Sequence, residues 1–344
     1  MLHFAVPHDV PIEFTRRPHR EGDEEPLLEM LRAAFGEWPN VEIQVEAIDH
    51  LHWKLDGPGG AKGLHRITEV DGRMASSTFC IVQWLKARDR RLHSIQGTDS
   101  CVHPDYQKRG LAEAIRRWRR QHPSDQACDV QFGVRSPHPA LLRIRKRMSQ
   151  VQTIANELQS LSLDLPAPAP AAASSLETAA WGIRPIERFD ERIDGFWREA
   201  AKPYSLIVEK TAEYLNWRYA DPRAGLFSIR LAEQGGDVLG YAVLRSSRGK
   251  GYLADLLALP GRFDVVQGLV ADAVMQVREA GASRLDCWLP AVHPYQDVLR
   301  DAGFMFRGTP TAVEIYIHNP DVDLSFLSDP HATVHICAGD TDLV

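Results

Sequence analysis

The hydrophobic and polar positions of this chain show the periodicity of strands in some segments and that of helices in others. The two kinds of segment alternate along the chain and predict a mixed α/β fold. Short apolar runs bounded by turn residues predict strands, whereas apolar positions three or four residues apart predict helices with one buried face. Leu111, Ala114, Ile115 and Trp118 share such a face. The first half is predicted to contain, in order, strand 12–17, helix 24–35, two strands joined at Asp71-Gly72 and ending near Trp84, strand 92–102, a helix from 111, strand 130–134 and a helix from Pro139.

The second half repeats this order at offsets of roughly 155–165 residues. It is predicted to contain strand 183–186, helix 192–200, a turn at Gly235-Gly236, strands 238–244 and 252–259, a helix capped by Asp264 and stopped near Gly281, strand 285–289 and a helix from Pro294. His138-Pro139 and His293-Pro294 occupy the same place in the two halves. A weak internal duplication explains the match, although proline is also favoured at the first position of any helix.

A proline- and alanine-rich stretch, LPAPAPAAASS at 165–175, separates the halves. Proline blocks regular hydrogen bonding and stiffens the chain into an extended spacer. We therefore expect an N-terminal domain at 1–163, a linker at 164–176 and a C-terminal domain at 177–344. The expected fold class is α/β (α+β), with a central, mixed and mostly antiparallel sheet flanked by helices in each domain.

Composition narrows the class of protein. The 344 residues are 44% hydrophobic and 25% charged, which excludes wholesale disorder, collagen and a coiled-coil rod. No apolar run approaches the ~18 residues that a membrane helix needs, and Met1 to Val10 shows no signal-peptide pattern, so we expect a cytoplasmic location without a membrane partner. The net charge of −6 argues against nucleic acid as a partner. An oligomer is possible.

The cysteine and histidine patterns predict neither disulfides nor a metal site. The five cysteines are odd in number and form no C-x-x-C pair, and the 14 histidines form no H-E-x-x-H motif. Charge is nevertheless uneven, because residues 106–150 carry eleven Lys/Arg against three acids. This basic patch has two interpretations, a solvated helix face or a site for a polyanionic ligand.

The stretch CVHPDYQKRGLA at 101–112 carries the most chemical information. It lies between a predicted apolar strand and an amphipathic helix. Its glycine lets the backbone approach a ligand closely, and the free N–H groups at a helix start attract anions. Lys108, Arg109, Arg116 and Arg117 add positive charge. On physical grounds the stretch binds a pyrophosphate or another polyanion, or it is an ordinary loop with a basic surface.

Gln107, Gly110 and Ala112, preceded by VHPDY, resemble motif A of the GNAT N-acetyltransferases, whose signature is Gln/Arg-x-x-Gly-x-Gly/Ala. The resemblance covers about residues 12–163. It implies a GNAT fold that binds acetyl-CoA, or another acyl-CoA, as co-substrate. The backbone amides of the loop would hold the pyrophosphate, and the main chain near the preceding strand would pair with the pantetheine arm. The implied cofactor-binding residues are Cys101, Val102, Gln107, Lys108, Arg109, Gly110, Leu111 and Ala112.

The second half resembles the same fold without the signature. Pro260, Gly261, Arg262 and Phe263 stand where the motif would be, and Asp264 would repel phosphate. The glycine-rich run 248–251 precedes a strand and is interpreted as a hairpin turn. The chain therefore resembles tandem-GNAT proteins with an intact motif A in the N-terminal half and a degenerate C-terminal half.

The catalytic residues are less determined. Members of the family often use a carboxylate on the strand before motif A as a base and a tyrosine on the last helix as an acid. Asp99 is the carboxylate at that place, or else a solvent-facing residue at the strand end. The start of the predicted last helix, residues 138–145, contains no tyrosine, and His138 either replaces it as acid or caps the helix. Cys101 as an acyl nucleophile is less favoured, because cysteine in an apolar strand is usually part of the core.

Tyr214, Trp217 and Tyr219, with Arg218, either line an acceptor pocket between the halves or pack as an ordinary helix. We expect an N-acyltransferase, an N-acetyltransferase in particular, that transfers acetyl directly to the amine of a small metabolite. The alternatives are an aminoacyltransferase of the peptidoglycan-bridge type and a non-catalytic CoA-binding or CoA-sensing protein.

Overall fold

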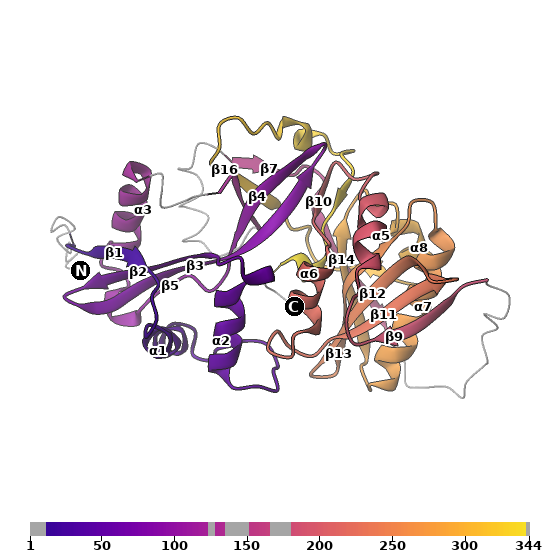
Figure 1. Ribbon diagram of the computed structural model, residues 1–344, viewed down its shortest axis with the longest axis horizontal. Coiled ribbons are helices and arrows are strands. Elements are labelled where there is room, and N and C mark those ends of the chain that lie inside the picture. The colour runs from indigo at the N-terminus through magenta and orange to yellow at the C-terminus, as the bar shows by residue number, and fades with distance from the viewer. Residues whose placement is uncertain (1–11, 123–127, 135–150, 166–179, 342–344) are drawn as a thin grey trace, which may run out of the picture.

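The computed structural model describes residues 12–122, 128–134, 151–165 and 180–341, which form two packed sheets with helices around them (Figure 1). The first sheet has ten strands. Its main path, in spatial order, is β1 (Thr15–Pro18), β2 (Leu64–Val70), β3 (Arg73–Ala87), β4 (Arg90–Gly97), β6 (Val130–Val134), β16 (Val313–Ile317) and β7 (Val151–Thr153). Two further strands, β5 (Cys101–Val102) and β10 (Leu206–Val208), pair with β3, and β17 (Val334–His335) pairs with β10.

The second sheet has seven strands. In spatial order they are β15 (Met305–Phe306), β8 (Leu158–Asp164), β14 (Arg284–Pro290), β13 (Lys250–Ala258), β12 (Asp237–Ser247), β11 (Ser228–Gln234) and β9 (Gly182–Ile186). The main helices are α1 (Glu24–Phe35), α2 (Ala47–Asp56), α3 (Leu111–Gln121), α5 (Arg192–Ala200), α6 (Ala212–Leu215), α7 (Phe263–Glu279) and α8 (Gln296–Asp301). Among the described helices, none is both long and apolar enough to cross a membrane.

The two sheets exchange strands. β8 precedes the linker in sequence, yet it pairs along its whole length with β14 of the second sheet. β16 comes from the far end of the chain, yet it lies between β6 and β7 of the first sheet. Each sheet is therefore complete only when both halves of the chain contribute, and Figure 1 shows the late, yellow part of the chain reaching back over β7.

The same strand–helix–strand unit occurs once in each half. β4 leads through α3 to the parallel strand β6, and β13 leads through α7 to the parallel strand β14. In both units the parallel pairing is short: it covers Ser94–Gln96 with Val130–Phe132, and Gly251–Leu253 with Leu285–Cys287. This repetition agrees with the internal duplication that the sequence indicates.

Successive side chains along a strand point to opposite faces of the sheet and so contribute to two different hydrophobic clusters. On β12, Tyr241 and Val243 face the cluster that contains α5, whereas Ala242 and Leu244 face the cluster under α7. This is the period of two expected for a strand that is buried on both sides. The cluster on the α5 side continues into the first half through α2, so the core itself joins the two halves.

Most of the predicted elements are present. Helices 24–35 and 192–200 and strand 130–134 have the predicted bounds, and the hairpin turn at Asp71-Gly72 joins β2 to β3. Two predictions need correction. Strand 92–102 is interrupted after Gly97, and α7 is capped by Arg262 rather than Asp264. The helix predicted from Pro139 lies outside the described residues.

A buried ion pair joins the C-terminal segment to the second sheet. Lys210 is fully buried and its Nζ contacts Asp255 on β13, at 2.7 Å from Oδ2, and Asp340 in the turn η6 (Ala338–Asp340). Burial opposes the charge of Lys210, but the two carboxylates outweigh burial and raise its pKa. The backbone carbonyl of Asp340 accepts hydrogen bonds from Gln83 and Gln96 of the first sheet, so this one turn contacts both sheets.

Replacing Lys210 by methionine is expected to lower the free energy of unfolding by about 3–5 kcal/mol, because it leaves two buried carboxylates without their cation. Urea unfolding measures the loss. Lys202→Met is the matched control, because the ammonium group of Lys202 is exposed and its pair with Glu199 contributes little. A loss below about 1 kcal/mol for Lys210→Met would show that the pair does not hold this segment in place.

Candidate functional site: an anion-binding loop and the residues beside it

The loop between β5 and α3 presents a run of unpaired backbone N–H groups. Within the described part of the chain, no group accepts a hydrogen bond from the backbone N–H of Lys108, Arg109, Gly110, Leu111 or Ala112. The first N–H groups of any helix lack partners within the helix, and the helix dipole adds partial positive charge at that end. The loop is thus a preformed site for an anion such as a phosphate.

Two residues in the left-handed region shape this loop. Lys108 has φ +60° and Gly110, the N-cap of α3, has φ +82°. A Cβ on Gly110 would meet no atom within 4 Å, so the space in front of the loop is open. The side chains of Lys108 and Arg109 are exposed beside it and leave the face of the loop positively charged. Arg116, one turn into α3, is instead paired with Glu113.

Gln107 ties the loop back onto β5. Its Nε2 donates a hydrogen bond to the carbonyl of Val102 at 3.0 Å. Because neighbouring residues of a strand point their backbone groups to opposite edges, Val102 faces away from β3, while the N–H of His103 bonds Ala75 on that strand. No described strand pairs with the edge that Val102 faces. Apart from the hydrogen bond that Gln107 donates, this edge is open to pairing with an extended ligand that carries amide groups.

Cys101 lies beside Val102 and packs against β3. Its Sγ is 3.7 Å from the hydroxyl of Ser77, and burial raises the pKa of the Cys101 thiol. The thiol is therefore protonated at neutral pH, which suits a packing role better than that of a nucleophile.

Asp99 lies in the turn between β4 and β5, and the side chain is largely buried, with 14% exposed. Its Oδ2 accepts a hydrogen bond from Lys54 Nζ at 2.5 Å, and Trp38 donates another hydrogen bond to the carboxylate. Burial alone would raise the pKa of Asp99, but the charge and hydrogen bond of Lys54, with that of Trp38, lower the pKa below its ordinary value. Asp99 is thus an ionised carboxylate held by partners.

The sequence analysis did not identify Lys54 or Trp38. Lys54 lies on α2 in the stretch HLHWKLD, which also contains two histidines and Asp56, so the sequence gives no clear sign that Lys54 is buried. His138, the other predicted catalytic residue, lies outside the described residues. The structure therefore groups the predicted anion loop, Val102 and Asp99 along one stretch of chain and adds two partners from the region of α1 and α2.

The corresponding loop of the second half does not offer an anion site. Asp264 lies in the first turn of α7 and is held by Arg262 through two hydrogen bonds of 2.7–2.8 Å and by Trp181 at 3.0 Å. The hydrogen bonds from Arg262 lower the pKa of Asp264 to about 2, so its negative charge is permanent at this helix start. A phosphate would meet a carboxylate there.

The aromatic residues after α6 are buried between the halves. Trp217 stacks on Trp53 of α2 at 4.7 Å between ring centroids, and each indole N–H donates to the backbone carbonyl of the other residue. Tyr214 and Tyr219 are also buried. Arg218, from the same run, is buried and donates hydrogen bonds to the carbonyls of Gly339 and Thr341. These residues pack α2 and the C-terminal segment together.

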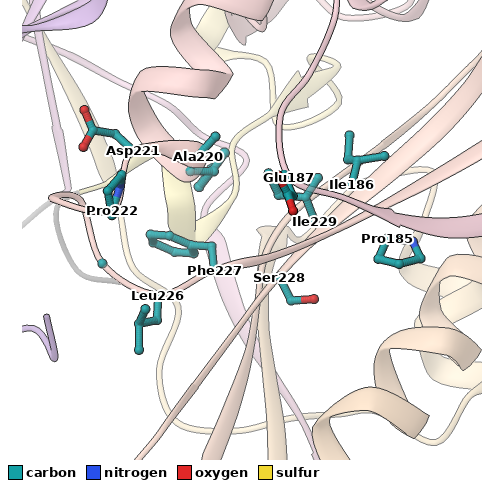
Figure 2. Close-up of a pocket in the computed structure, with 12 residues that line it drawn as sticks. Pro185, Ile186, Glu187, Ala220, Asp221, Pro222, Leu226, Phe227, Ser228 and Ile229 are labelled. Atoms are coloured by element: carbon teal, nitrogen blue, oxygen red, sulfur yellow. The ribbon is translucent and has the colours of Figure 1, made fainter. Parts of the chain in front are cut away.

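A groove of about 360 Å³ lies on the second half, lined by residues 185–187 at the end of β9 and by residues 219–222 and 225–229 leading into β11 (Figure 2). Its walls are about equally polar and apolar, and the carboxylate of Asp221 is hydrogen-bonded to Arg223. The same segment reaches the first half: the guanidinium of Arg223 contacts Asp56, and its carbonyl contacts His50, both on α2.

Comparisons with known proteins give no match in sequence and clear matches in structure. No protein-family model and no curated protein matches the chain. A crystal structure of a conserved Enterococcus faecalis protein of unknown function, described as a probable N-acyltransferase, has a TM-score of 0.66 at 10% identity, covering 89% of this chain and 73% of that one. A GCN5-related N-acetyltransferase from Anabaena variabilis has a TM-score of 0.63 at 10% identity, with the same coverage of both chains.

Saccharomyces cerevisiae N-myristoyltransferase, solved with bound myristoyl-CoA and inhibitors, has a TM-score of 0.60 at 13% identity and covers 95% of this chain and 88% of that one. These similarities show the fold. The chain has the fold of the GCN5-related N-acetyltransferases, with two GNAT units in tandem, as the sequence resemblance implied. The fold class predicted from the hydrophobic pattern is confirmed.

Proposed function

We propose that this chain is an acyl-CoA-dependent N-acyltransferase that binds one acyl-CoA at its N-terminal GNAT unit. The observation that carries the proposal is the run of five unpaired backbone N–H groups at 108–112, with basic side chains beside it and a free strand edge next to it. The loop lies between β5 and α3, and its resemblance to motif A supports a pyrophosphate as its ligand. In the proposed division, residues 1–163 bind acyl-CoA, 164–176 form the linker and 177–344 form the degenerate unit.

The bound acyl-CoA would extend from the loop at 108–112 along the edge of β5. Its pyrophosphate would accept hydrogen bonds from the loop amides, with Lys108 and Arg109 contributing charge. Its pantetheine arm would pair with the free edge at Val102, next to Cys101. Gln107 fixes the distance between loop and strand, because its side chain donates a hydrogen bond to the Val102 carbonyl on this same edge. The thioester would then lie toward the turn that carries Asp99.

The proposed reaction is direct transfer in a complex of acyl-CoA and acceptor. The amine nitrogen attacks the thioester carbonyl, so that a C–N bond forms and the C–S bond breaks. The nitrogen loses a proton and the departing thiolate gains one. We propose acetyl as the acyl group and the amine of a small metabolite as the acceptor, on the basis of the resemblance to motif A.

Calorimetry and a thiol-release assay test the proposal. Titration with acetyl-CoA is expected to give one site per chain, and a panel of small amines is expected to contain an acceptor that releases free CoA thiol. Myristoyl-CoA is included because one structural neighbour was solved with that donor. Binding without thiol release across the panel and both donors would favour a CoA-binding protein that is not an enzyme. Absence of binding would overturn the proposal.

A further inference from the structure

Arg245 is a buried cation on β12 that has almost no partner in the protein. Only 5% of its surface is exposed. Among the described residues, its one hydrogen bond runs from Nη2 to the backbone carbonyl of Glu42, at the long distance of 3.4 Å, and no carboxylate pairs with it. Charged side chains are rarely buried without a paired anion, because burial removes their hydration. The guanidinium group of Arg245 therefore lacks the anion that such a position normally contains.

The neighbours of Arg245 add to the unbalanced charge. Arg218, a second buried arginine, approaches the same aromatic ring: the guanidinium carbons of Arg218 and Arg245 are 5.6 and 5.8 Å from the centroid of Phe227. Burial and the charge of Arg218 lower the pKa of Arg245, and Glu42 only partly opposes this, because its carboxylate accepts a hydrogen bond from Ser247 instead. Contact with an aromatic face compensates for part of the lost hydration. An anion at this place would be attracted by both arginines.

Solvent reaches the free side of the guanidinium group. Nε and Nη1 of Arg245 form no hydrogen bond with the described residues, yet neither atom is fully enclosed. Arg245 comes two residues after Val243 and so lies on the face of β12 that is turned toward the first half. Phe227, beside it, lines the groove of the second half (Figure 2), and Glu42 is exposed. A small charged group can therefore approach Arg245 where the two halves meet.

We propose that Arg245 binds a carboxylate group of a small molecule at the junction of the two halves. A guanidinium group presents planar, paired N–H donors that match the two oxygens of a carboxylate. The small exposed fraction of Arg245 suits this flat group better than a phosphate. Two sources share the chemistry: a carboxyl group on the acceptor amine, and a separate carboxylic acid. The binding site itself does not depend on the proposed function, whereas its assignment to the acceptor rests on it.

The position of Arg245 favours the acceptor as the source. The guanidinium carbon of Arg218 is also 5.9 Å from the ring of Trp53 on α2, and the next residue of that helix, Lys54, holds Asp99. The junction thus carries buried basic groups from both halves, in continuity with the turn that holds Asp99. An acceptor bound to Arg245 through its carboxyl group would extend from the second half toward the first, which gives the degenerate unit a role in selecting the acceptor.

Nitrogen NMR of the arginine Nε–H groups tests the site, with sodium acetate as the probe and sodium chloride to keep the ionic strength constant. The signal that is lost in Arg245→Gln identifies Arg245, and in the wild type it is expected to shift saturably with acetate. Two charge-assisted hydrogen bonds correspond to roughly 10–10²-fold weaker acetate binding in the variant, followed at the backbone amide of Phe227. If Arg245→Gln does not fold, Arg245→Lys identifies the same signal.

Arg184→Gln is the matched control, because Arg184 lies on the same sheet and is already paired with Glu233 at 2.7 Å. This variant is expected to bind acetate like the wild type. Arg245→Gln is expected to keep the wild-type Tm, since no ion pair is lost. An Arg245 signal that does not respond to acetate, or equal acetate affinity in Arg245→Gln and the wild type, would overturn the proposal. Tighter binding of inorganic phosphate than of acetate would overturn the assignment to a carboxylate.

An amine and its carboxylated analogue from the acceptor panel, such as ethylamine and β-alanine, distinguish the two sources. If the carboxyl group belongs to the acceptor, Arg245→Gln raises the KM of the carboxylated amine roughly 10–10²-fold and leaves the KM of its analogue and the Kd of acetyl-CoA unchanged. If it belongs to a separate acid, the variant loses acetate binding while both KM values stay the same. Absence of acetyl-CoA binding would remove the proposed function, and the acetate titration would still decide on the site at Arg245.

Discussion

Replacement of Gly110 by aspartate is expected to reduce acyl-CoA affinity at least 10³-fold while leaving the fold intact. Gly110 has φ +82°, which aspartate tolerates better than most residues, and a Cβ there meets no atom within 4 Å. The new carboxylate would stand in front of the unpaired amides and face the pyrophosphate. One like-charge pair about 4 Å apart costs about 4 kcal/mol at an effective dielectric of 20, which corresponds to roughly 10³ in affinity.

Calorimetry of the variant measures this loss, and the second half offers a matched control. Gly261 lies two residues before the start of α7, with φ +77° and the same open space around a Cβ as Gly110, which directly precedes α3. Gly261→Asp should bind acetyl-CoA with wild-type affinity. Equal loss in both variants would point to a general defect of the chain, and full affinity in Gly110→Asp would remove this loop from the binding site.

Residues 1–163 expressed alone are expected to lack a cooperative unfolding transition. Without the second half, β6 and β7 lose β16, which lies between them, and β8 loses β14. β3 also loses β10, and the shared core is opened. Circular dichroism during urea titration tests this, and a sharp transition together with wild-type transfer activity would contradict it.

A protease site placed between residues 170 and 171, within the proline- and alanine-rich linker, separates the effect of the strands from that of the covalent link. Cleavage at this site is expected to leave a folded complex that migrates as one species in size-exclusion chromatography, because the two fragments hold each other's strands. If the fragments separate on cleavage, the exchanged strands do not hold the halves together.

The sequence predicts local structure well where one short pattern determines it. Asp71-Gly72 gives a hairpin because both residues accept positive φ, and their values here are +50° and +72°. The predicted loop from Gln107 to Ala112 precedes α3, and its amides are unpaired because a helix start leaves them so. In both cases the determining residues are neighbours in the sequence.

Features that depend on distant residues could not be predicted in this way. The apolar pattern of β16 is compatible with either sheet, and only the overall packing places it beside β6. Lys54 and Asp99 are 45 residues apart, and neither residue alone indicates the partner. The carbonyl of Arg223 that contacts His50 lies 173 residues away in the sequence and belongs to the backbone, where sequence patterns carry no signal.

The position of β16 also bears on how the chain folds during its synthesis. β16 begins about 180 residues after β6 ends, and translation at roughly 5–20 residues per second separates the two strands by about 10–40 s. Until β16 emerges from the ribosome, β6 lacks the strand that covers this edge, and the edge can pair with other chains. The N-terminal half is therefore synthesised first, but its sheet is completed last. A protein that binds exposed strand edges during translation would bind at the edge of β6.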